Sequence, residues 1–407
     1  MGTKARRVEY SQTLTAANAD GWSTAGPLER AQRSRVDFDS GRRDFLRAIG
    51  SFGIGAFIAS RSATAGSFEL PRQEETAFDL GDFSLQSGKV LRNARLAYKT
   101  HGQLDSTKGN AILYPTQYAA QHGDVEWLIG PGKALDPDRY FIVVLDQLGN
   151  GLSSSPSNTP SPQDRMRFPA VTILDNVVAQ HRLVTEKFGI SRVSLVVGYS
   201  MGAQQAFQWA TSHPNRVERI APFCGTAKTT PHNAVFLEGL RAALTADSAW
   251  MEGEYRDQPT RGIRAFARVY AGWGFSQQFY KQELFRQMGF GSLSEFLSGF
   301  WEKRYLRRDA NNLLSMLHTW QVNDLGATPG FGGSLNRALG AIKAKATVMA
   351  AQTDLYFTPE DIEADASRIP GARFRVIPSL FGHMTGIGSD PSDAQFIAAE
   401  IRALLAS

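Results

Sequence analysis

The segment Gly198-Tyr199-Ser200-Met201-Gly202 constrains the fold of this chain more than any other. An apolar run at 193–197 precedes it, and a stretch typical of a helix follows at 203–211. A serine between a strand and a helix occupies a sharp turn, and the flanking glycines leave room for close backbone approach. The pattern predicts a nucleophile elbow that presents the Ser200 hydroxyl at the end of a sheet and leaves the Met201 N–H free to stabilise an oxyanion. The alternative is a glycine-rich helix start with a surface serine.

Short apolar segments alternate with segments of helical periodicity along much of the chain. The segments that predict strands are Leu96–Thr100, Ala111–Tyr114, Tyr140–Leu145, Val193–Val197, Arg219–Phe223, Ala346–Ala350 and Phe374–Ile377. The segments that predict helices are Ile173–Phe188, Ala203–Ser212, Pro359–Arg368 and Ala394–Leu405. Several of the strand segments are apolar throughout, as strands covered on both faces are. The pattern therefore predicts an α/β fold with a mostly parallel central sheet flanked by helices.

The stretch from about 226 to 341 interrupts this alternation. It has no convincing strand segment, and it is rich in phenylalanine, tyrosine and tryptophan. We interpret it as a large helical insertion, a lid over the carboxyl edge of the sheet. Most of its aromatic side chains are expected to pack between lid helices, and a minority to line a substrate channel.

A nucleophilic serine needs a base, and the base needs an acid that orients it. Asp354 directly follows one predicted strand, and His383 follows the next. Of the seven histidines, only His383 lies C-terminal to Asp354. The order Ser200, Asp354, His383 therefore predicts a catalytic triad. Asp354 could instead cap a turn or helix, and His383 could be a core or solvent-exposed histidine.

The second oxyanion donor is expected in the loop that follows the predicted strand 111–114. This loop begins Pro115-Thr116-Gln117, and proline has no N–H. Thr116 or Gln117 is therefore predicted to act beside Met201. No residue is assigned to a metal or a cofactor. Cys224 is the only cysteine, in an apolar run that predicts a buried strand residue, so neither an internal disulfide nor a cysteine metal cluster can form.

Residues 1–65 predict an export signal rather than part of the fold. Arg42-Arg43 precedes an apolar stretch at 48–60, and small residues at 63–65 suit cleavage. The apolar stretch is shorter than the roughly 20 residues that span a bilayer, so no stable membrane insertion is expected after cleavage. We expect a twin-arginine signal, a catalytic domain at 66–407 and a periplasmic or secreted location. The alternative is a disordered terminus followed by a short helix.

The basic charge of the chain comes mostly from its first 65 residues. They contain ten Lys and Arg against six Asp and Glu, a net charge of +4 out of +5 for the whole chain. The remainder therefore has a net charge of about +1. This balance argues against a nucleic-acid-binding face, which requires clustered basic residues.

Several motifs together resemble the homoserine O-acyltransferase-like branch of the α/β-hydrolase superfamily. They are Gly198–Gln205 with Trp209-Ala210, Trp127–Gly132, Phe141–Gly151, Thr353–Tyr356 and Gly382-His383. The resemblance extends over residues 78–405. It implies an α/β-hydrolase fold, an acyl-Ser200 intermediate and a lid that forms a deep tunnel. It leaves open whether the chain is a homodimer.

Two positions depart from the acyltransferase pattern. That family usually has an aspartate directly after the catalytic histidine, where this chain has Met384. It also has an arginine in the first lid helix, where Leu240 falls and Arg241 is one residue away. Without these charges the pocket has no partner for the carboxylate of an amino acid, and an exported enzyme would meet little acyl-coenzyme A.

These departures favour water as the acyl acceptor. The sequence therefore predicts a serine hydrolase that cleaves a small, apolar acyl ester. An acyltransferase with a different acceptor is the second hypothesis. A non-catalytic binding protein on a hydrolase scaffold is the third, although no member of the predicted triad is missing.

Overall fold

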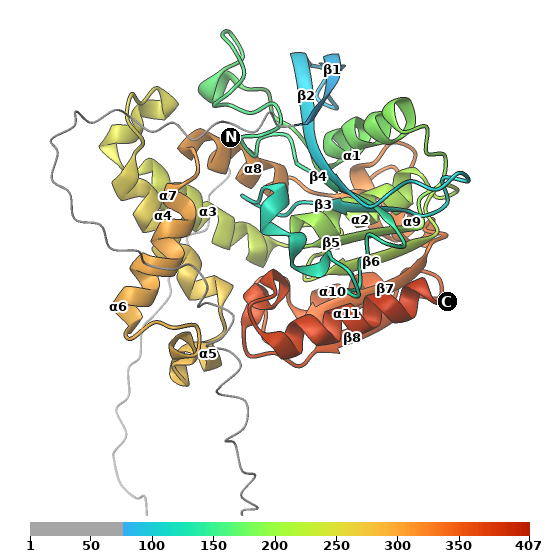
Figure 1. Ribbon diagram of the computed structural model, residues 1–407. Coiled ribbons are helices and arrows are strands. Elements are labelled where there is room, and N and C mark those ends of the chain that lie inside the picture. Colours follow the sequence, from blue (N-terminus) through green and yellow to red (C-terminus); the bar gives the residue numbers. More distant parts are fainter. Residues whose placement is uncertain (1–75) are drawn as a thin grey trace, which may run out of the picture. The chain divides into compact units, whose positions relative to one another are not determined.

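The computed structural model describes residues 76–407. The predicted export signal at 1–65 lies outside the described residues and stays a prediction. Within residues 76–407, eight strands form one sheet in the order β1-β2-β4-β3-β5-β6-β7-β8 (Figure 1). The strands are β1 (Ala77–Ser84), β2 (Val90–His101), β3 (Ala111–Pro115), β4 (Phe141–Leu145), β5 (Leu195–Tyr199), β6 (Arg219–Phe223), β7 (Lys345–Ala351) and β8 (Arg373–Ile377).

The sheet is parallel from β4 through β8, and only its β1 and β2 edge is antiparallel. Every residue of β3, β4 and β5 is buried, which explains why these strands are apolar throughout. The prediction of a mostly parallel sheet is confirmed. The sequence did not predict β1, in which exposed and buried residues are mixed and the register shifts on both sides of Gly81.

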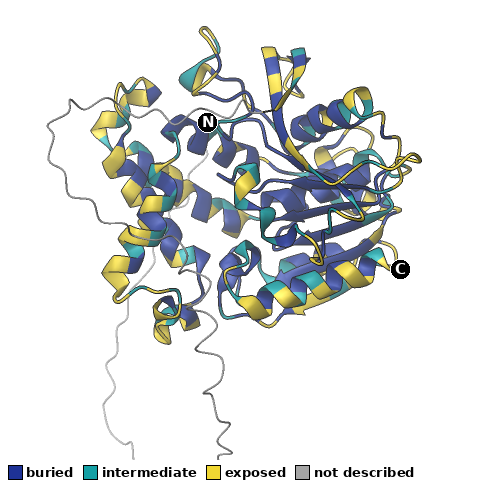
Figure 2. Cartoon of the chain, viewed as in Figure 1, coloured by how far each residue is buried: buried dark blue, intermediate teal, exposed yellow. Residues whose placement is uncertain are grey.

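Helices cover both faces of the sheet, as predicted. On one face, α1 (Ile173–Arg182), α2 (Met201–Ser212) and α10 (Pro359–Ala366) pack in a common core with one set of strand side chains. On the other face, α11 (Pro391–Leu405) packs with the alternate set and with residues 125–135. Figure 2 shows the central strands of the sheet buried and the outer side of α11 exposed. No helix of residues 76–407 is long and apolar enough to span a membrane.

Local sequence fixes where these helices begin. Thr172 caps α1 in a capping box with Asp175, Thr358 caps α10, and Asp390 caps α11. In α10 and α11 a proline occupies the first turn, where a missing N–H costs nothing. The predicted helix Ile173–Phe188 is shorter as an α-helix, because after Arg182 it continues as a π-helical turn.

The chain between β6 and β7 is helical, and Figure 1 shows much of it to one side of the sheet. Its helices are α3 (Pro231–Thr245), α4 (Thr260–Gly274), α5 (Gln277–Lys281), α6 (Leu293–Phe296), α7 (Lys303–Leu306), α8 (Ala310–Gln321) and α9 (Leu335–Gly340). We call residues 226–341 the lid. Many of its aromatic side chains, Trp301 and Trp320 among them, are fully buried. They pack against one another between the helices, as expected from the composition.

Two histidines stack where α1 and α2 lie side by side. The rings of His181 and His213 are 4.2 Å apart between centroids and 13° from parallel. Burial lowers the pKa of both imidazoles, that of His213 to about 4, and the charge of Arg216 lowers both further. Glu186 opposes this effect at His181. Both rings are therefore neutral in the folded protein at neutral pH.

We expect these histidines to destabilise the fold in acid. The unfolded chain binds protons near a histidine pKa of about 6.5, whereas the folded chain binds them only at lower pH. The contribution of the two histidines to stability should therefore decrease as the pH drops from about 6.5 toward 4. The melting temperature of a His213→Phe variant, followed by circular dichroism, should fall less over this range than that of the wild type. Asp365 and Asp393, whose pKa values burial raises to about 6, act in the opposite sense in both proteins. Parallel losses in the two proteins would contradict the assignment.

Candidate active site

Ser200 lies at the turn between β5 and α2, as the sequence predicts. It is the N-cap residue of α2, with φ 58° and ψ −122°. A non-glycine residue with positive φ is strained, so surrounding contacts must hold it there. One such contact is the Ser200 N–H, which donates to the carbonyl of Phe223 at the end of β6 at 3.0 Å. The backbone of the neighbouring strand thus fixes the position of the serine.

The two glycines of the motif are required by close backbone contacts. A Cβ on Gly198 would lie 2.1 Å from the carbonyl oxygen of Gly202. A Cβ on Gly202 would lie 2.6 Å from the carbonyl oxygen of Pro115, at the end of β3. Gly202 therefore allows the start of α2 to approach the loop after β3.

Ser200, His383 and Asp354 form one chain of hydrogen bonds. His383 Nε2 is 3.0 Å from Ser200 Oγ, and His383 Nδ1 is 2.6 Å from Asp354 Oδ2. Asp354 follows β7, and His383 lies in a 3-10 turn, Gly382–Ile387, that follows β8. The carboxyl ends of parallel strands share one edge of the sheet, which brings these distant residues together. All three are buried.

The bonding partners define the protonation pattern of His383. Asp354 Oδ1 accepts hydrogen bonds from the N–H groups of Tyr356 and Phe357, both at 3.1 Å, so Oδ2 is left for the imidazole. A carboxylate only accepts, so Nδ1 carries the proton that it donates to Asp354. The lone pair of Nε2 then faces the Ser200 hydroxyl. This is the arrangement in which an imidazole can take a proton from serine.

Two tyrosines that the sequence analysis did not assign hold the imidazole. The ring of Tyr199 lies 4.8 Å from that of His383, and its hydroxyl donates to the His383 carbonyl at 2.7 Å. The ring of Tyr356 lies 4.4 Å away. A Cβ on Gly386 would lie 2.1 Å from the Tyr199 ring, so Gly386 permits this packing. Both tyrosines belong to the motifs around Ser200 and Asp354, which is the signal that could have found them.

The backbone amides near Ser200 separate the two candidates for the second oxyanion donor. The Thr116 N–H donates to the carbonyl of Leu145 at 2.9 Å, the bond that extends the pairing of β3 with β4. The Thr116 N–H therefore cannot serve as the second oxyanion donor, because it is already bonded to Leu145. Within residues 76–407 the N–H groups of Gln117 and Met201 have no hydrogen-bond acceptor. These two remain as the pair that could bind an oxyanion.

Lid aromatics pack directly against the residues that hold His383. Phe236 of α3 stacks on Tyr356 at 4.7 Å between centroids, and the hydroxyls of Tyr270 in α4 and Tyr356 are 3.3 Å apart. Trp320 of α8 stacks on Phe357 at 5.4 Å. The surroundings of the imidazole on the lid side are therefore aromatic.

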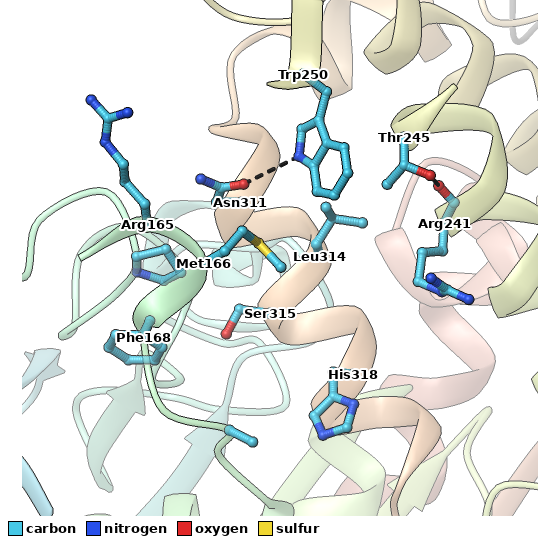
Figure 3. A pocket seen from close by; sticks show the side chains of 12 residues that line it. Arg165, Met166, Phe168, Arg241, Thr245, Trp250, Asn311, Leu314, Ser315 and His318 are labelled. Carbon is cyan, nitrogen blue, oxygen red and sulfur yellow. Dashed lines mark hydrogen bonds between the residues drawn. The ribbon is translucent and has the colours of Figure 1, made fainter. Parts of the chain in front are cut away.

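The two positions that depart from the acyltransferase pattern are apolar and buried. Met384 is 3% exposed, and Leu240 is fully buried. Arg241 lies on the exposed side of α3, where it donates to Glu238 at 3.0 Å. Arg241 instead borders a separate cavity of about 260 Å³ between the lid and residues 156–170. Figure 3 shows the side chains that line this cavity. Ser200, Asp354 and His383 do not line that cavity.

Other reactive groups are few in the part of the chain that the structure describes. Residues 76–407 contain no group of three or more His, Cys, Asp or Glu side chains arranged to hold a metal ion. Cys224 is buried as predicted, and burial raises the pKa of its thiol. It lies one residue beyond β6 rather than in the strand, with φ 50°. The chain turns there beneath Ser200, whose carbonyl would lie 2.5 Å from a Cβ on Gly225.

Comparison with known proteins gives a consistent set of relatives. Residues 117–388 match the family described as alpha/beta hydrolase fold. The chain is 39% identical to an ethyl acetate hydrolase of Pseudomonas veronii over 345 residues, which cover 84% of this chain and 96% of that protein. It is 32% identical to a homoserine O-acetyltransferase of Methanococcoides burtonii over 338 residues, 74% of this chain and 68% of that protein.

A solved structure gives the same result. The crystal structure of an acetylester hydrolase from Corynebacterium glutamicum superposes with a TM-score of 0.80 at 38% sequence identity. The match covers 82% of this chain and 96% of that one. The similarity therefore includes both the sheet and most of the lid.

Proposed function

Because the chain belongs to the α/β-hydrolase fold family, as its motifs predicted, we propose that it is a serine esterase that cleaves esters of short carboxylic acids, acetate esters above all. The names of its relatives in Pseudomonas veronii and Corynebacterium glutamicum support the substrate class. The single observation that carries the mechanism is the hydrogen-bonded chain from Asp354 through His383 to Ser200.

The reaction proceeds through an acyl-serine intermediate. Ser200 Oγ attacks the ester carbonyl carbon while His383 Nε2 takes its proton. The N–H groups of Met201 and Gln117 stabilise the tetrahedral oxyanion. When the bond to the alcohol breaks, His383 returns the proton to the departing oxygen. Water then attacks the acyl-serine by the same route, and Asp354 stabilises the imidazolium in both halves.

Apolar residues at two key positions support water as the acyl acceptor. An amino-acid acceptor would bring a carboxylate near Met384 and Leu240, where both side chains are buried and neither can pair with it. Burying an unpaired charge is strongly unfavourable. The sequence similarity to homoserine O-acetyltransferases favours a second candidate function. In it, the acyl group is transferred to a different, uncharged acceptor.

Competing substrates separate hydrolysis from transfer. We expect saturable release of acetate from ethyl acetate and p-nitrophenyl acetate, and a fluorophosphonate adduct that mass spectrometry maps to Ser200. With acetyl-coenzyme A and homoserine we expect no O-acetylhomoserine above the level made by a Ser200→Ala control. A kcat/KM for O-acetylhomoserine formation equal to or above that for ester hydrolysis would overturn the proposal in favour of a transferase.

A further inference from the structure

A row of buried polar side chains leads from α2 to the loop after β3. The indole Nε1 of Trp209 donates to Gln180 Oε1 at 2.8 Å, and Gln180 Nε2 donates to Gln205 Oε1 at 2.6 Å. Gln205 Nε2 then donates to the carbonyl oxygen of Thr116 at 3.0 Å. Gln180 and Gln205 are fully buried, and Trp209 nearly so. Burying polar groups is unfavourable unless they are bonded, and here each amide is bonded at both ends.

The direction of this row is fixed by its two ends. An indole N–H can only donate, so Gln180 must turn its oxygen toward Trp209. Its nitrogen then faces Gln205, which in turn must present its own nitrogen to Thr116. A backbone carbonyl only accepts, which agrees with this direction. The orientation of the Gln205 amide therefore follows from its bonding partners.

Gln205 holds the peptide groups next to both candidate oxyanion donors. The carbonyl of Thr116 and the N–H of Gln117 belong to one planar trans peptide, in which they point in opposite directions. Gln147 Nε2 also donates to this carbonyl, at 2.5 Å. The second hydrogen of Gln205 Nε2 is donated to the carbonyl of Met201 at 3.1 Å. One side chain thus connects the strand loop to the first residue of α2.

We propose that Gln205 is a positioning residue that aims the Gln117 N–H and fixes its distance from the Met201 N–H. Fixing the Thr116 carbonyl toward α2 leaves the Gln117 N–H directed the other way. Hydrogen bonds to that carbonyl also polarise the amide and make its N–H a stronger donor. The inference rests on the proposed function, since an oxyanion forms only if Ser200 attacks a carbonyl.

The test separates transition-state stabilisation from substrate binding. In a Gln205→Met variant, kcat for p-nitrophenyl acetate should fall by about 10- to 100-fold, less than the loss of a whole oxyanion donor. KM should stay within about twofold, because the affected interaction forms only in the transition state. Rates are expressed per reactive serine, counted by complete fluorophosphonate labelling, so that unfolded protein does not contribute.

An inhibitor supplies an independent readout. A short alkyl trifluoromethyl ketone adds to serine as a tetrahedral oxyanion, so its Ki should rise in Gln205→Met by the same factor by which kcat/KM falls. Gln208→Met is the matched control. Gln208 is a buried glutamine of the same helix that bonds Ser212 and Thr328 instead, and its replacement should leave kcat within about twofold.

A Gln205→Glu variant carries the test if the methionine variant does not fold. A buried glutamate has a raised pKa, and only its protonated form can donate to the Thr116 carbonyl. Its activity relative to the wild type should therefore rise as the pH is lowered. Wild-type kcat in a folded Gln205→Met, an equal loss in Gln208→Met, or a pH-independent ratio for Gln205→Glu would overturn the inference. Full activity of Ser200→Ala would instead overturn the proposed function.

Discussion

A Ser200→Ala variant is expected to lose p-nitrophenyl acetate hydrolysis by about 10⁵- to 10⁶-fold. The hydroxyl of Ser200 forms the hydrogen bond with His383 Nε2, and without it the imidazole has no nucleophile to activate. The fold should survive, because the backbone bond from Ser200 to Phe223 does not involve the side chain. Steady-state kinetics measure the loss, and far-ultraviolet circular dichroism checks the fold.

A serine elsewhere on the same helix controls for this change. Ser212 is the last residue of α2, and its hydroxyl accepts a bond from Gln208. Ser212→Ala should keep the wild-type rate within about twofold. If Ser200→Ala hydrolysed the ester as fast as Ser212→Ala does, the serine mechanism would be wrong.

An Asp354→Asn variant is expected to lose about 10⁴-fold in kcat although it changes one atom. Oδ1 of Asp354 accepts two backbone N–H bonds, so the asparagine oxygen should take that place and its nitrogen should face His383 Nδ1. An amide nitrogen donates, so Nδ1 would have to accept and the ring proton would move to Nε2. His383 would then present an N–H to Ser200 and could not act as a base. Kinetics at a pH where wild-type activity is maximal measure the loss.

A second buried carboxylate is the matched control for this variant. Asp365 of α10 accepts a bond from the N–H of Ala227, and burial raises its pKa to about 6. Asp365→Asn changes the same group at a site outside the hydrogen-bonded triad, so it should affect stability rather than kcat. An Asp354→Asn enzyme that retained a tenth of the wild-type kcat would contradict the proposed tautomer.

The parts of the fold that the sequence predicted are those with strong local patterns. The β5 and β6 strands are buried on both faces and are continuous apolar runs. Their composition therefore predicted them to within a few residues. By contrast, β1 is an edge strand of mixed burial with a bulge at Gly81, and its sequence has no clear alternation. Its pairing with β2 comes from tertiary structure.

The candidate site could also be predicted only where local sequence patterns mark its residues. Chain order and the positions after strands selected Ser200, Asp354 and His383 as candidates. The engagement of Thr116 depends on the register of β3 against β4, which no local pattern specifies. The bond from Gln205 to Thr116 joins residues far apart in the chain, so it appears only once the fold is known.

The stacking of Phe236 on Tyr356 has a consequence for engineering. Tyr356 lies against the imidazole of His383, and Phe236 stacks on Tyr356. Shortening Phe236 would remove a stacking partner of the ring that lies against the proposed general base. Redesign of the lid should therefore leave this aromatic ring in place.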